Sequence, residues 1–149
     1  MLLFVGLALA DAPLPTDPAW TVSGIVGFPG GLGVDVARRL TDGFALSGQL
    51  ATWVAISDLG VRGRGFLVRG ERWSFVVGGG VHALVAPVLF SPGALAVELG
   101  PGVAYQAPSG FTFGLDGGPA LWLSLPHHTE GGGGVSVAEF AQLAVGWRL

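Results

Sequence analysis

Eight segments whose side chains alternate between apolar and mixed character constrain the fold of this chain most strongly. Turn signals separate them, and they lie at 19–28, 32–40, 44–56, 60–69, 73–85, 94–106, 111–125 and 135–149. Successive side chains of a β-strand point to opposite faces of the sheet, so each segment divides into two rows. One row of the last segment is almost wholly apolar: Val135, Val137, Glu139, Ala141, Leu143, Val145, Trp147 and Leu149. The pattern predicts eight antiparallel strands with one apolar face.

The composition indicates the environment of that apolar face. Half of the residues are hydrophobic, only 11% are charged and the mean hydropathy is +0.63, which is unusual for a domain surrounded by water. After the first residues, Gly, Pro or a charge interrupts every apolar run, so helical membrane spans of about 20 residues are not expected. We therefore predict an all-β fold, an eight-stranded antiparallel up-and-down transmembrane β-barrel.

The charge and the cysteine count exclude other classes. The net charge is -3 and no basic cluster is present, so nucleic acid is not an expected partner. The chain has no Cys, which excludes a disulfide framework and a thiolate metal site.

The first residues resemble a targeting segment. A short apolar run ends in Ala8-Leu9-Ala10, which fits a signal-peptidase site before Asp11. We expect a signal peptide at 1–10, a proline-rich lead-in at 11–18 and the barrel at 19–149, with a buried first strand as the alternative for the apolar run. We therefore expect the exported protein to reside in the bacterial outer membrane.

Connections and aromatic residues give the expected orientation. In outer-membrane barrels both termini face the periplasm, and the turns there are short. That arrangement predicts periplasmic turns at 41–43, 70–72 and 107–110, and outer loops at 29–31, 57–59, 86–93 and 126–134. Aromatic residues on the outward rows at the periplasmic ends then form a membrane-interface girdle. Its members are Trp20, Phe44, Trp73, Phe75, Tyr105, Phe111, Phe113 and Trp147.

The inward rows carry the charges. Their polar members are Asp35, Arg39, Gln49, Arg62, Arg64, His82, Glu98, Asp116, Gln142 and Arg148. Charges in so narrow a lumen must pair, because a buried unpaired charge costs several kcal/mol. We predict a salt-bridge network, with Arg39, Asp116 and Arg148 in the periplasmic half and the other charges and His82 in the outer half. A gated path for small ions is the functional alternative.

Other features predict less. The predicted loop at 126–134 carries His127, His128 and Glu130. Residues of these types occur in metal sites and, together with a serine such as Ser124, in hydrolases. A solvated loop is the preferred interpretation. Pro101 and Pro119 fall inside strands, where a bulge or kink is expected. No metal, cofactor or catalytic residue is predicted.

With these rows and connections the chain resembles the small outer-membrane barrels typified by the OmpA transmembrane domain and OmpX, over residues 19–149. The resemblance implies a monomer in outer-membrane lipid, inserted by the barrel-assembly machinery. Members of that class commonly end in an aromatic residue, whereas this chain ends in Trp147-Arg148-Leu149. The expected role is structural or surface-interacting. The alternatives are a barrel enzyme that modifies lipid A or phospholipid, and a soluble exported lipocalin-like barrel that binds an apolar ligand.

Overall fold

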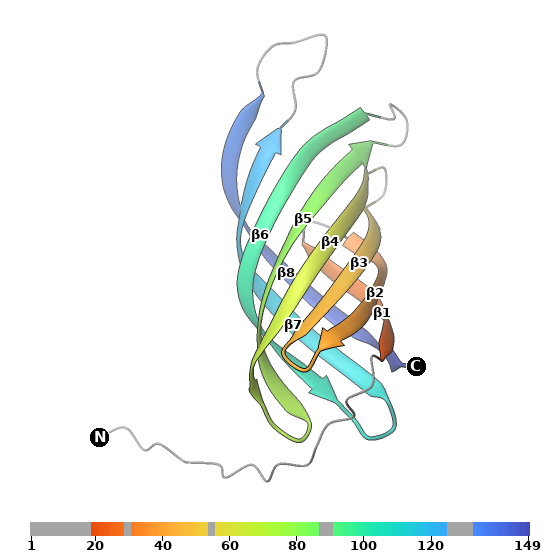
Figure 1. The fold of residues 1–149 in the computed structure, drawn as a ribbon. Helices are drawn as coiled ribbons and strands as arrows, with labels where there is room; N and C mark the ends of the chain where they lie inside the picture. Colours follow the sequence, from red (N-terminus) through yellow and green to blue (C-terminus); the bar gives the residue numbers. More distant parts are fainter. Residues whose placement is uncertain (1–18, 29–30, 54–55, 87–90, 125–132) are drawn as a thin grey trace, which may run out of the picture.

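The protein is a closed β-barrel of eight strands (Figure 1). The computed structural model describes residues 19–28, 31–53, 56–86, 91–124 and 133–149, and these contain no helix long and apolar enough to cross a membrane. The strands are β1 (Trp20–Phe28), β2 (Gly31–Thr41), β3 (Phe44–Trp53), β4 (Ile56–Arg69), β5 (Trp73–Ala86), β6 (Ser91–Gln106), β7 (Phe111–Ser124) and β8 (Gly134–Arg148). The predicted signal peptide at 1–10 and lead-in at 11–18 lie outside the described residues.

Each strand pairs antiparallel with its neighbours in sequence, and β1 closes the barrel against β8 from Thr21↔Arg148 to Phe28↔Ala141. This confirms the predicted all-β, up-and-down eight-stranded fold. The alternation that predicted the strands also fixes their register, because a slip by one residue would turn every charged inward row outward.

The barrel has two rims. We call the one at which β1 begins and β8 ends the terminal rim, and its turns occupy 42–43, 70–72 and 107–110. The opposite one, at which β1, β3, β5 and β7 end, is the far rim. The prediction of a loop at 57–59 was wrong: these residues belong to β4, where Thr52↔Ser57 and Ala51↔Asp58 continue the ladder. The loop predicted at 86–93 is also shorter, because β6 begins at Ser91.

The prolines interrupt one ladder without a bulge. Pairing between β6 and β7 stops after Glu98↔Ala120 and resumes at Gly102↔Asp116 in the same register. Pro101 and Pro119 fall inside this gap and lack the N–H that a ladder needs. A short unpaired window therefore takes the place of the expected bulge at each proline. Glycine is required beside it, since a Cβ on Gly100 would lie 2.7 Å from the carbonyl carbon of Gly117.

The strands differ in length, so the far rim is uneven. β1, β2 and β3 have 9, 11 and 10 residues, whereas β7 and β8 have 14 and 15. The β7–β8 hairpin consequently rises beyond the end of β1 (Figure 1). Glu139 lies on this extension, exposed on the outward row opposite Pro119 in unbroken register. No bulge turns it inward.

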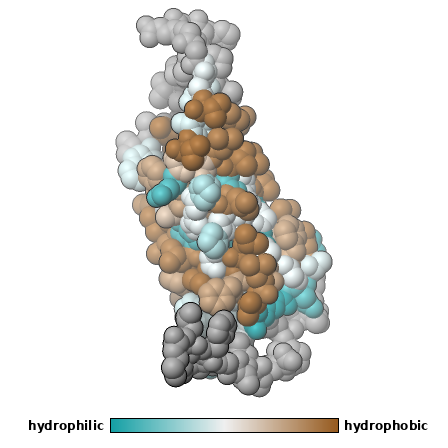
Figure 2. All heavy atoms as spheres, turned by 90° about the vertical axis from the view of Figure 1, so that its left-hand side faces the viewer, coloured by the Kyte–Doolittle hydropathy of each residue, from teal (hydrophilic) through white to brown (hydrophobic). Residues whose placement is uncertain are grey.

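The barrel has the reverse polarity of a soluble protein. Among the described residues ten buried side chains are polar or charged and seven are hydrophobic, and four of those seven are alanine. Large apolar side chains instead cover the outside on every strand, including Val34, Leu50, Val61, Val81 and Leu99. Figure 2 shows hydrophobic residues over much of one outer face, crossed by a paler stretch. The centre is thus polar, and the apolar surface points outward.

Candidate functional site

A charged network fills the barrel interior, with Arg62 at its centre. Arg62 is 1% exposed, and its Nε lies 2.5 Å from Oε1 of Glu98. Its Nη2 lies 3.0 Å from Oδ1 of Asp116, and its Nη1 donates a 2.6 Å hydrogen bond to Oε1 of Gln142. Arg64 binds the second oxygen of Asp116 through Nη2 at 3.1 Å. One guanidinium group therefore connects β4 to β6, β7 and β8 across the lumen.

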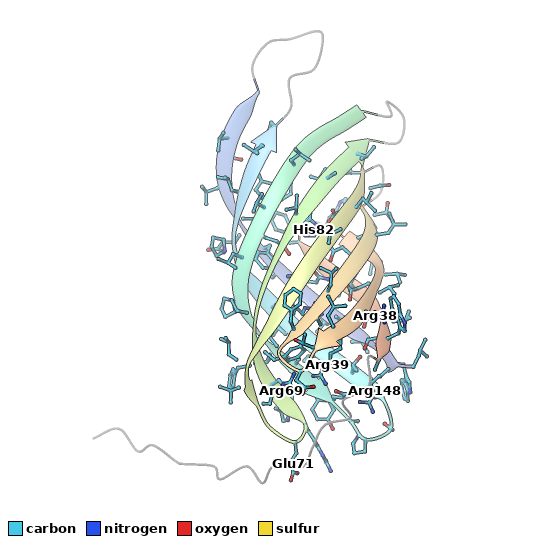
Figure 3. All side chains as sticks on the ribbon, in the orientation of Figure 1. Arg38, Arg39, Arg69, Glu71, His82 and Arg148 are labelled. Carbon is cyan, nitrogen blue, oxygen red and sulfur yellow. The ribbon has the colours of Figure 1, made fainter. Side chains whose placement is uncertain are left out.

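His82 extends the network toward the far rim (Figure 3). Its Nδ1 lies 3.1 Å from Oδ1 of Asp58, and its Nε2 lies 3.2 Å from Oε1 of Glu98. A neutral imidazole has a single N–H, so a ring that faces a carboxylate on each side is satisfied only as the imidazolium. With His82 charged, three cationic groups meet the carboxylates of Asp58, Glu98 and Asp116, and the network is electrically balanced.

Two glutamines complete the network. Gln142 donates through Nε2 to Oε1 of Gln49 at 3.3 Å. The amide nitrogen of Gln49 lies 3.1 Å from Nδ1 of His82, but both are N–H donors when His82 is charged, so Gln49 joins the network through Gln142. Within the described part of the chain, no serine, threonine or tyrosine hydroxyl is hydrogen-bonded to His82. Among the described residues the arrangement thus provides ion pairing.

Glycine makes space for this network in a narrow barrel. A Cβ on Gly80 would lie 2.7 Å from Cγ of Arg62, and one on Gly60 would lie 2.5 Å from Nδ1 of His82. Both glycines are on inward rows, directly opposite Arg62 and His82 in the ladder between β4 and β5. The hollow that remains beside His82 measures about 20 Å³, little more than one water needs.

The structure divides the predicted inward residues differently from the sequence analysis. Seven of the ten, Gln49, Arg62, Arg64, His82, Glu98, Asp116 and Gln142, belong to the network. Asp116 was expected near the terminal rim but binds Arg62 and Arg64, because the tilt of the strands brings β7 to their height. Asp35 was expected with His82, yet it lines a separate cavity with Arg39 and Arg148.

Asp58 is the network residue that the sequence analysis missed. It is buried and holds His82, although Ser57-Asp58-Leu59 has the composition of a turn. The available signal was the continuation of the inward row of β4 through Asp58, Gly60, Arg62 and Arg64 at a period of two.

The eight aromatic residues predicted for the girdle lie toward the terminal ends of their strands. Trp20, Phe44, Trp73, Phe75 and Trp147 are exposed. Tyr105, Phe111 and Phe113 are half-buried. Two of these three pack on exposed neighbours: Tyr105 lies 4.8 Å from Trp73 and Phe111 5.8 Å from Trp147, measured between ring centroids. The guanidinium of Arg38 lies 5.3 Å from the ring centroid of Trp20.

The candidate residues His127, His128 and Glu130 lie outside the described residues, and Ser124 ends β7. Comparison of the chain with protein-family models, curated proteins and solved structures finds no match.

Proposed function

We propose that this protein is an integral outer-membrane β-barrel with a structural or surface-interaction role and a closed, non-conducting lumen. The observation that carries the proposal is the reversed polarity: charged side chains are buried, and large apolar side chains are exposed on every strand. Exposed apolar surface of this extent is stable when hydrocarbon, and not water, surrounds it.

The interior argues against a soluble barrel that carries an apolar ligand. Such a carrier needs an apolar cavity, because most of the surface of its ligand must be buried against hydrophobic side chains. Here Arg62, Glu98, Asp116 and His82 occupy the centre. The same four residues leave no space there for a lipid chain.

The lengths of the three shortest strands fit a bilayer. β1, β2 and β3 have 9, 11 and 10 residues, and a transmembrane strand needs about 9 to 11. The exposed Trp and Phe rings at the terminal rim then lie at the headgroup level. Glu139, beyond the end of β1, lies above the hydrocarbon in this placement, which explains a carboxylate on an otherwise apolar row.

The network closes the lumen. Arg62 connects strands on opposite sides of the barrel, and the hollow beside His82 measures about 20 Å³. Planar-bilayer recordings of the purified protein should therefore show no discrete conductance. Regular single-channel steps would contradict the closed lumen without contradicting membrane insertion.

Membrane insertion has its own test. The full chain is expressed with its first residues intact, and membranes are washed with sodium carbonate at high pH. We expect the protein to stay in the pellet and to migrate faster on gels when it is not heated, because the barrel resists detergent. Release into the supernatant, with equal migration before and after heating, would show that the chain is soluble or peripheral.

A further inference from the structure

A second cavity lies between the charged network and the terminal rim. Its volume is about 120 Å³, and it reaches the rim, because Ala19 and the turn residues Gly70, Glu71 and Arg72 form part of its lining. A cavity of about 150 Å³ holds a molecule the size of benzene. The space therefore suits a small ligand whose far end projects from the mouth.

The floor of this cavity carries an unsatisfied carboxylate. Asp35 is 1% exposed, lines the cavity, and its Oδ1 has no hydrogen-bond partner among the residues that the structure describes. Leaving a buried carboxylate without a donor or cation is unfavourable. Arg64 also lines the cavity, but its guanidinium is paired with Asp116. The floor at Asp35 thus favours a group that is positively charged and donates hydrogen bonds.

The mouth carries the opposite charge. Arg39 and Arg148 line it, and the nearby Arg69 acts on Arg39 as a further like charge (Figure 3). The one acidic group acting on Arg39 among the described residues is Asp42, whose side chain is 64% exposed and lies 4.0 Å from Arg69.

Neutral partners hold two of these guanidinium groups in place. Arg39 lies over the Phe66 ring, with its Cζ 4.9 Å from the ring centroid. The side-chain oxygen of Gln106 accepts from Arg148 at 3.0 Å (Nε) and 2.6 Å (Nη1) when its amide is oriented toward the guanidinium. Neither partner neutralises a charge. Glu71 and Arg72, both exposed on the turn, offset each other. The mouth therefore favours an anion.

We propose that this cavity binds a small zwitterion that joins a primary amine to a phosphate, with the ammonium group on Asp35 and the phosphate on Arg39 and Arg148. Asp35, Ala37 and Arg39 follow one another on the inward row of β2, so charge changes from positive at the mouth to negative at the floor along the path by which a ligand would enter. Four residues of strand put about 13 Å between the Cα atoms of Asp35 and Arg39, and both residues line the same cavity. The ligand is either free in solution or the headgroup of an amine-bearing phospholipid.

The test is calorimetry on the full chain folded in maltoside micelles, with O-phosphoethanolamine as the probe. We expect saturable binding, and binding at least tenfold weaker for ethanolamine and for inorganic phosphate. Asp35→Asn and Arg39→Gln should each weaken binding at least tenfold. Their matched controls, Glu139→Gln and Arg38→Gln, should bind as the unaltered protein does, because Glu139 is exposed on the outward row of β8 and Arg38 lies on the outward row over Trp20.

Two results would overturn the proposal: no saturable binding of the probe, or phosphate binding of equal strength that Asp35→Asn leaves unchanged. Amide NMR of the unaltered protein keeps the proposal testable if a variant fails to fold. The probe should shift the amides of Asp35 and Arg39 and leave that of His82 in place, and the opposite pattern would contradict it. Competition by nanodiscs that contain phosphatidylethanolamine, compared with phosphatidylcholine, then separates the lipid source from the free one. None of these measurements depends on where the protein resides in the cell.

Discussion

Arg62 and Glu98 form an ion pair inside the barrel, with Nε and Oε1 2.5 Å apart and neither residue more than 7% exposed. Around this pair the network is balanced in charge, so that each member is satisfied by another. Removing one member leaves its partners as uncompensated buried charges, which is the costly event in such an arrangement. The network should therefore respond far more strongly to single substitutions than to matched double ones.

Arg62→Met tests this directly. Methionine retains most of the side-chain length, but Glu98 and Asp116 lose their shared cation, and we expect the free energy of unfolding to fall by about 3–5 kcal/mol. Urea unfolding of the protein in lipid vesicles measures it. Arg38→Met is the control, because Arg38 lies on the outward row, and it should change stability by less than about 1 kcal/mol.

Adding Glu98→Gln to Arg62→Met should recover part of the loss, since it removes one of the charges left unpaired. If the two single variants and the double variant were simply additive, the ion pair would not be coupled.

Gly80→Ala tests the space that glycine provides. The new methyl group would lie 2.7 Å from Cγ of Arg62 and 3.0 Å from the carbonyl oxygen of Val61. Crowding of this kind costs about 1–3 kcal/mol. Gly48→Ala, on β3, is the matched control, because a Cβ there meets nothing within 4 Å. It should be neutral or slightly stabilising in the same unfolding measurement. Equal effects of the two variants would show that Gly80 is not needed for packing.

Much of the fold could be predicted from the sequence because the period of two is a local property that the barrel preserves. The inward row of β4, for example, carries Arg62 and Arg64 in the pattern and in the structure. Contacts across the lumen could not be predicted in this way. The pairing of Arg62 with Asp116 joins residues 54 apart and depends on strand tilt and stagger, which the alternation leaves undetermined. For the same reason Asp35 was grouped with His82, although it lines the other cavity.

Asp58 shows the limit of composition as a guide. Ser and Asp favour turns because their side chains bond to the local backbone, yet here the Asp58 carboxylate binds a histidine 24 residues away. A buried partner for His82 outweighed the local preference.

Asp58→Asn should weaken this end of the network less than Arg62→Met weakens its centre. The amide keeps the shape of the side chain and removes one charge, and His82 retains Glu98 at 3.2 Å. We expect a loss of about 1–3 kcal/mol in the free energy of unfolding, as for a hydrogen bond between charged groups. Asp42→Asn, at an exposed turn, should stay within about 0.5 kcal/mol. A loss no larger than that of Asp42→Asn would mean that Asp58 is not a structural partner of His82.

Val36→Arg tests what surrounds the barrel at mid-height. Val36 is exposed at the middle of β2, and the sequence alone does not tell whether water or hydrocarbon covers it. In a bilayer an outward arginine at this depth should lower the free energy of unfolding, measured in vesicles, by about 2–4 kcal/mol. At the end of the same strand, Thr41→Arg should cost about 1 kcal/mol or less, because the side chain reaches the headgroups.

If the barrel is soluble, Val36→Arg should cause no such loss of stability. Arginine on a water-exposed strand is tolerated within about 0.5 kcal/mol, and it would raise solubility by interrupting an apolar surface. Vesicle-folding titrations of the two arginine variants therefore distinguish the environments by the dependence of the loss on depth. If Val36→Arg and Thr41→Arg fold equally well, hydrocarbon does not cover the middle of β2, and the reversed polarity needs another explanation.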